Sequence, residues 1–143
     1  MQQIKPKIFA IANQKGGVGK TTTTLNLAAA IAEAGFKVLV MDLDPQGNAS
    51  TGLGSHADAR AFTTYDVLIG TQVELRFIQK TDIGNIDLVP STTDLSSADI
   101  ELASAKNRSE MLRKVLSNSD LSKYDYILLD CPPSLNVLTV NAL

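Results

Sequence analysis

The sequence predicts an α/β protein with a mostly parallel sheet and helices on both faces. Three apolar segments, residues 7–13, 37–42 and 126–130, have the length and composition of strands covered on two sides. Segments with helical periodicity lie between them, and such alternation is typical of parallel βαβ units. A glycine-rich turn at residues 15–22 joins the first strand to the first helix, which is a further mark of this class.

The connecting segments can be assigned in chain order. The first helix is expected to end near Gly35, a usual C-terminal stop. Residues 45–60 are rich in Gly, Ser, Asn and Asp, and predict a mobile loop. The apolar positions of the first helix are Leu25, Leu27, Ala28, Ile31 and Ala32. Further elements are expected at residues 64–69 (short helix), 86–90 (short strand), 95–105 and 109–116 (amphipathic helices).

The composition is that of one globular domain. The 143 residues are 44% hydrophobic and 20% charged, which argues against disorder. With 13 basic and 15 acidic residues the net charge is −2, so no overall field favours nucleic acid. No apolar run approaches the ~20 residues of a membrane span, and a cytoplasmic protein without membrane association is expected. The single cysteine, Cys131, excludes an internal disulfide and is expected to be a buried filler, and His56 a solvated side chain.

Residues 15–22, Lys-Gly-Gly-Val-Gly-Lys-Thr-Thr, predict a phosphate-binding loop of the P-loop NTPase type. Without side chains at its three glycines, the backbone can point successive N–H groups at an anion, which also meets the positive end of the following helix. Lys20 can reach the β- and γ-phosphate oxygens, and the Thr21 hydroxyl can ligate Mg²⁺. The alternative is a glycine-rich turn with a chance Gly-Lys-Thr. The predicted nucleotide-binding residues are Lys15, Gly16, Gly17, Val18, Gly19, Lys20, Thr21 and Thr22.

Acidic residues follow two of the predicted strands, where a parallel sheet places its ligand-binding edge. Asp130 closes Ile-Leu-Leu-Asp, the Walker B arrangement, and can hold Mg²⁺ opposite Thr21. Asp42 and Asp44 end the second strand at alternating positions, so both carboxylates can face the phosphates. Acids near phosphates repel them, which favours a role towards the metal or the attacking water.

A second lysine, Lys15, precedes the glycines, and Gln14 stands where the common loop pattern has glycine. The loop resembles that of the deviant Walker A ATPases, with the signature Lys-Gly-Gly-x-Gly-Lys-Thr/Ser. Together with Asp42-Leu-Asp-Pro-Gln46 and Asp130-Cys-Pro-Pro-Ser134, it makes nearly the whole chain similar to the N-terminal half of a ParA/Soj-type partitioning ATPase. The chain breaks off in an unfinished apolar segment, residues 135–143, so residues 1–143 are expected to be a truncated part of one domain whose C-terminal half is absent.

The resemblance implies Mg²⁺-dependent ATP hydrolysis that controls a homodimer. It implies that Lys15 crosses the dimer to the partner's ATP, that Asp44 orients the attacking water, and that Asp42 supports the metal shell. Lys15, Lys20 and Asp44 are thus the expected catalytic residues, and Thr21, Asp130 and Asp42 the metal residues. For the full-length family it also implies a ParB-type centromere-binding partner, non-specific DNA and nucleoid association.

Three other functions stay open at this point. A MinD-like membrane-cycling ATPase would use the same scaffold, and so would a small-molecule kinase, although the double-lysine loop argues against the kinase. The third alternative is a non-catalytic fragment that binds a nucleotide without hydrolysing it.

Overall fold

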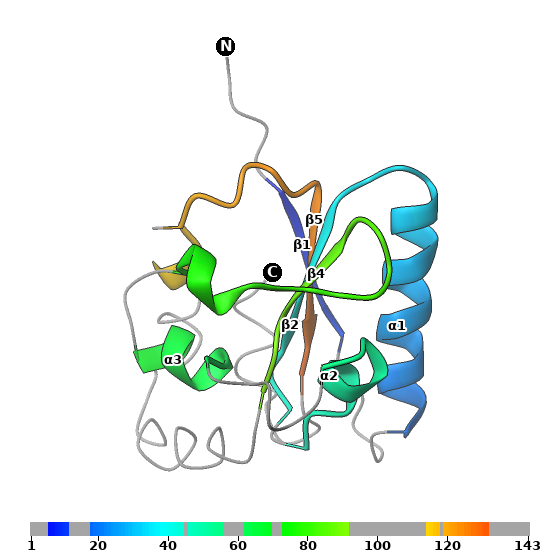
Figure 1. Ribbon diagram of the computed structural model, residues 1–143, viewed down its shortest axis with the longest axis horizontal. Helices are drawn as coiled ribbons and strands as arrows, with labels where there is room; N and C mark the ends of the chain where they lie inside the picture. Colours follow the sequence, from blue (N-terminus) through cyan, green and yellow to red (C-terminus); the bar gives the residue numbers. More distant parts are fainter. Residues whose placement is uncertain are drawn as a thin grey trace.

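The computed structural model describes residues 6–11, 18–44, 46–55, 62–69, 73–91, 114–117 and 119–131. Within them, five strands form one sheet in the order β1-β5-β2-β4-β3 (Figure 1). Each neighbouring pair is parallel except β3 and β4, which pair antiparallel. The predicted mostly parallel α/β fold is therefore confirmed, and β3 is the one described strand that the sequence analysis did not expect. The strands are β1 (Lys7–Ile11), β2 (Val38–Asp42), β3 (Gln79–Lys80), β4 (Ile86–Val89) and β5 (Tyr126–Asp130).

Helices cover both faces of the sheet, as predicted (Figure 1). On one face, α1 (Val18–Glu33) packs with α2 (Asn48–Gly52) over alternate residues of β2, β4 and β5. On the other face lie α3 (Thr64–Ile69), η2 (Leu75–Phe77) and the helical residues 114–117. No helix in these described segments is long and apolar enough to cross a bilayer.

The central strand β2 is buried along its whole length, but β1 is not. Among the described strands β1 pairs only with β5, and Phe9 is 43% exposed. The prediction that this strand is covered on two sides is therefore wrong for the face that carries Phe9. An edge strand has side chains of a neighbouring strand on one flank only, whereas β2 lies between two strands and two helical layers.

The first helix ends as predicted. Gly35 has φ 96°, its N–H donates to the Ala32 carbonyl at 3.0 Å, and the Phe36 N–H donates to the Ile31 carbonyl at 3.3 Å. This pair of bonds is a Schellman motif, which requires a left-handed residue that glycine adopts without strain. Of the apolar positions assigned to this helix, Leu27 is 38% exposed and takes no part in the core.

The segment after β2 differs from the prediction. Residues 48–52 form the short helix α2, so a mobile loop over residues 45–60 is wrong for this part, while residues 56–60 lie outside the described residues. Gly47 precedes α2 with φ 67°, and its carbonyl accepts hydrogen bonds from the N–H and the hydroxyl of Thr51. Gly, Ser and Asn are common in loops, but the same residue types are also preferred at the start of helices. The composition of this segment therefore predicted a loop where a short helix begins.

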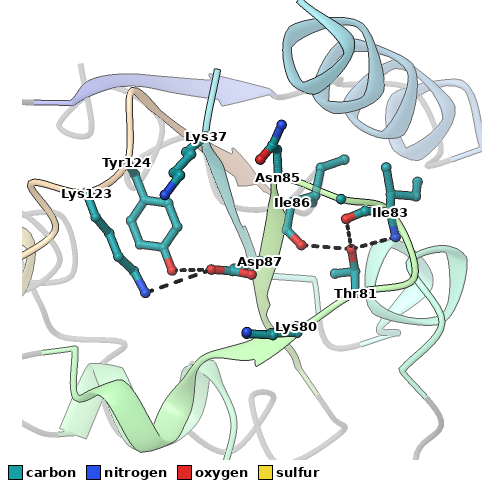
Figure 2. A pocket seen from close by; sticks show the side chains of 10 residues that line it. Lys37, Lys80, Thr81, Ile83, Asn85, Ile86, Asp87, Lys123 and Tyr124 are labelled. Atoms are coloured by element: carbon teal, nitrogen blue, oxygen red, sulfur yellow. Dashed lines mark hydrogen bonds and ion pairs between the residues drawn. The ribbon is translucent and has the colours of Figure 1, made fainter. Parts of the chain in front are cut away.

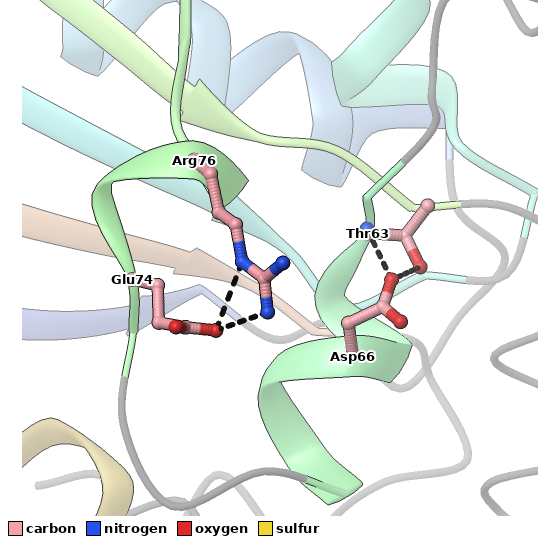
Figure 3. A network of polar contacts seen from close by, with 4 residues as sticks. All are labelled: Thr63, Asp66, Glu74 and Arg76. Atoms are coloured by element: carbon pink, nitrogen blue, oxygen red, sulfur yellow. Dashed lines mark hydrogen bonds and ion pairs between the residues drawn. The ribbon is translucent and has the colours of Figure 1, made fainter.

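The predicted short helix and short strand are confirmed as α3 and β4. The Thr63 N–H donates to the carboxylate of Asp66 in the first turn of α3 at 2.8 Å, which is half of a capping box (Figure 3). Nearby, Arg76 forms an exposed ion pair with Glu74 at 2.9 Å. Of the two predicted amphipathic helices, residues 95–105 lie outside the described part of the chain, as do 109–113, and residues 114–117 are helical.

Candidate functional site

The carboxyl ends of the parallel strands meet at one edge of the sheet, and α1 begins beside them (Figure 1). β1 ends at Ile11 and α1 starts at Val18, so the strand and helix that should flank the predicted phosphate loop are both in place. Lys15, Gly16 and Gly17 lie outside the described residues. The side chains of residues 18–20, which include Lys20, are outside them as well.

The first turns of α1 are tied to the end of β5 by a buried hydrogen bond. The Thr24 hydroxyl donates to Oδ1 of Asp130 at 2.9 Å, and both side chains are fully buried. Thr21 lies three residues earlier in the helix and therefore on the same face. Its hydroxyl oxygen is buried and has no hydrogen-bond partner in the part of the chain that the structure describes. Thr22 is exposed in the same turn.

Asp42 lies beside Asp130 in the sheet, because the two residues are direct partners in the β2–β5 register. It is fully buried and accepts three hydrogen bonds. The donors are the N–H of Asp44 at 3.0 Å, the N–H of Ser50 at 2.9 Å and the hydroxyl of Ser50 at 2.6 Å. The two bonds from Ser50 join the end of β2 to α2.

The pKa of Asp42 is raised from 3.8 to about 6, mainly by burial and in part by the neighbouring charge of Asp130. The hydrogen bonds from Ser50 and Asp44 act in the opposite direction, since they stabilise the charged form. At neutral pH the carboxylate is therefore mostly ionised.

Asp44 follows β2 and is also buried, with 6% of its surface exposed. Its Oδ1 accepts the N–H of Gln46 at 3.0 Å, and its carbonyl accepts the N–H of Gly47 at 2.9 Å and the hydroxyl of Ser91. The structure thus brings Asp42, Asp44 and Asp130 to the same edge of the sheet as the start of α1.

The oxygen groups at this edge fit Mg²⁺. Thr21 offers a buried hydroxyl without a partner in the described chain, and Asp130 offers a buried carboxylate held by α1. In the described residues no group of three or more His, Cys, Asp or Glu side chains could hold a metal. Mg²⁺ keeps several waters and needs few protein ligands when phosphates supply the rest.

Sequence reasoning missed four polar residues that organise this edge. They are Thr24, Ser50, Thr64 and Ser91, and each has no exposed surface. The Thr64 hydroxyl donates to the Asp42 carbonyl at 2.6 Å, which connects the start of α3 to the end of β2. Only Thr24 had a usable signal, because its spacing from Thr21 places both on one helix face.

A cavity of about 370 Å³ lies at the opposite edge, near the amino ends of β2, β4 and β5 (Figure 2). Lys37, Lys80 and Lys123 line it, and the Tyr124 hydroxyl donates to Asp87 at 2.7 Å. Burial raises the pKa of Tyr124, and the hydrogen bond and charge of Asp87 raise it further. Ligands of parallel α/β sheets bind at the carboxyl ends of the strands, so this cavity is separate from the candidate site.

Comparisons with known proteins agree with the geometry. A family model described as an AAA domain matches residues 6–143. The chain is 51% identical over 138 residues to the chromosome partitioning protein ParA of Caulobacter vibrioides, and the match covers 96% of this chain and 52% of that protein. It is 47% identical over 137 residues to the sporulation initiation inhibitor protein Soj of Bacillus subtilis, with 96% and 54% covered.

Among solved structures, a cobyrinic acid a,c-diamide synthase of Mycobacterium smegmatis with bound ADP and magnesium has a TM-score of 0.84 and 38% identity. That match covers 96% of this chain and 56% of the synthase. The chain thus spans about half the length of the known proteins that it matches.

Proposed function

Because the chain belongs to the AAA domain family, whose model matches residues 6–143, we propose that it acts as an ATP-dependent dimerisation switch of the ParA/Soj partitioning type. The observation that carries the proposal is the buried Thr21 hydroxyl, which has no partner in the described chain. It lies one helical turn before the Thr24–Asp130 hydrogen bond. A buried hydroxyl left without a partner costs free energy, and a bound ion would supply the missing contact.

The proposed ligand is ATP with Mg²⁺. Thr21 and Asp130 would hold the metal, and we assign Asp42 a supporting role beside them, because its oxygens already accept hydrogen bonds from Asp44 and Ser50. When bound, Mg²⁺ neutralises charge on the β- and γ-phosphates. The backbone N–H groups of residues 15–22 and the Lys20 ammonium would bind the phosphate oxygens.

Asp44 is the proposed water-orienting residue. Phosphoryl transfer has a loose transition state, so the protein mainly positions the water and stabilises charge. A carboxylate at the ligand-binding edge can accept a hydrogen bond from that water, and the Asp44 main chain is fixed by Gly47 and Ser91. Lys15 is the proposed contact to the ATP of the partner subunit, so that the dimer forms only when nucleotide is bound.

The partners proposed here come from the family resemblance and from the names of the matched proteins. Two relatives each match 96% of this chain. One is named chromosome partitioning protein ParA, and the other is named Soj. On that ground we propose a ParB-type partner that stimulates hydrolysis, non-specific DNA as a partner of the whole protein, and a cytoplasmic, nucleoid-associated location.

Nucleotide titration, phosphate release and light scattering test these roles. We expect Lys20→Ala to lose ATP binding, Asp44→Ala to bind ATP without turnover, and Lys15→Gln to bind ATP without forming dimers. Lys80→Ala is the matched control, because this exposed lysine is at the opposite edge of the sheet. Absence of ATP binding by the folded protein with Mg²⁺ present would refute the proposal.

A further inference from the structure

A buried polar network joins the carboxyl ends of β2 and β4, and Ser50 is its centre. Ser50 has no exposed surface and donates both its N–H and its hydroxyl to Oδ2 of Asp42, at 2.9 and 2.6 Å. Its hydroxyl oxygen accepts the N–H of Ser91 at 3.1 Å. The hydroxyl therefore both donates and accepts, and no replacement without an oxygen can keep these contacts.

The two residues that Ser50 contacts hold the main chain of Asp44 from both sides. Oδ1 of Asp42 accepts the Asp44 N–H at 3.0 Å, and the hydroxyl of Ser91 donates to the Asp44 carbonyl. Both contacts hold Asp44, in the loop after β2, and both come from residues that hydrogen-bond to Ser50. The position of the Asp44 backbone thus depends on one serine in the next helix.

We propose that Ser50 is a positioning residue for Asp44, setting the place of its carboxylate through Asp42 and Ser91. This inference rests on the proposed function, in which Asp44 orients the attacking water. Ser50 touches neither the predicted phosphate loop nor Asp130 through any hydrogen bond between described residues, so its loss should spare nucleotide binding. Turnover should suffer, because a displacement of about 1 Å at a reacting group can reduce the rate ~100-fold.

The test is steady-state ATP hydrolysis by Ser50→Ala and Ser50→Thr. For Ser50→Ala we expect kcat to fall ~10- to 100-fold, with the Kd for ATP changed by less than about threefold. Ser50→Thr keeps the hydroxyl and should restore most of kcat. Ser55→Ala is the matched control: Ser55 is a buried serine of the same segment whose hydroxyl donates to Gln79 at 2.9 Å, away from Asp42 and Asp44. It should keep the kcat of the unmodified protein.

A second variant covers the case in which Ser50→Ala does not fold. Ser91→Ala removes the hydroxyl that donates to the Asp44 carbonyl, and it should also lower kcat while ATP binding is kept. The double variant, with Ser50→Ala and Ser91→Ala together, should lose no more kcat than the worse single variant, because both serines act through one loop. Additive losses would show independent roles and would contradict the inference.

The outcomes separate this inference from the proposed function. If the unmodified protein hydrolyses ATP and Asp44→Ala does not, an unchanged kcat in Ser50→Ala, or in Ser91→Ala when Ser50→Ala is unfolded, overturns the positioning role alone. An equal loss in Ser50→Ala and Ser55→Ala overturns it too, since that is the result of general destabilisation. If the unmodified protein binds no ATP, both the proposed function and this inference fail.

Discussion

The hydrogen bond between Thr24 and Asp130 should contribute measurably to stability. Both side chains are fully buried, and the oxygens are 2.9 Å apart. Thr24→Val keeps the branched shape of the side chain and leaves little cavity, but removes the only donor in it. A hydrogen bond to a charged group contributes ~1.5–3 kcal/mol, so we expect the free energy of unfolding to fall by about 2 kcal/mol.

Urea unfolding at pH 7, without nucleotide or Mg²⁺, measures this difference. Thr24→Ser is the control, because it keeps the donor and loses one methyl group, which costs about 1 kcal/mol. The expected order of stability is unmodified protein, Thr24→Ser, then Thr24→Val. A double-mutant cycle with Asp130→Asn should give a coupling energy of ~1–2 kcal/mol. The reasoning fails if Thr24→Val is as stable as the unmodified protein, or more stable than Thr24→Ser.

Three further measurements test Gly47 in the loop after β2, Asp42 at the end of β2, and Tyr124 at the amino ends of the strands. Gly47→Ala forces a side chain onto φ 67° and should lower the unfolding free energy by ~1–2 kcal/mol, whereas Gly84→Ala meets open space and should change it by less than about 0.5 kcal/mol in the same urea assay. The pKa of Asp42 rises from 3.8 to about 6 on folding, so its stabilising contribution is present below pH 4 and is lost as the pH rises through 6. Relative to Asp42→Asn, the unfolding free energy in Mg²⁺-free buffer should therefore fall by up to about 3 kcal/mol between pH 4 and 7, and equal pH dependence of the two proteins would contradict this. Tyr124→Phe leaves Asp87 without a 2.7 Å donor and should cost ~1–2 kcal/mol in thermal or urea unfolding, and an unchanged midpoint would count against that bond.

The sequence determined the class of fold and the general place of the site. Continuous apolar runs at residues 37–42 and 126–130 can only be stable when both faces are covered, and they became the buried strands β2 and β5. The left-handed residue that ends α1 was also readable, because glycine adopts φ 96° without strain. These features depend on residues close together in the chain, so local chemistry was sufficient to predict them.

Secondary structure between strands was less predictable. The segment after β2 has the composition of a loop, yet residues 48–52 are helical because Asp42 accepts hydrogen bonds from Ser50 and fixes the first turn. The exposure of Phe9 could not be predicted either, because the residues of β1 do not by themselves determine where this strand lies in the strand order.

The polar contacts of the candidate site were decided by tertiary structure alone. The serine pair that joins the end of β2 to the end of β4 is 41 residues apart in sequence, and the bond between Thr24 and Asp130 spans 106 residues. The pattern of a strand or a helix reports which face each residue occupies, but not which distant donor will lie within 3 Å of a buried oxygen. That pairing arises only when the sheet order and the helix positions are fixed together, because a buried polar group must find its partner wherever packing brings one.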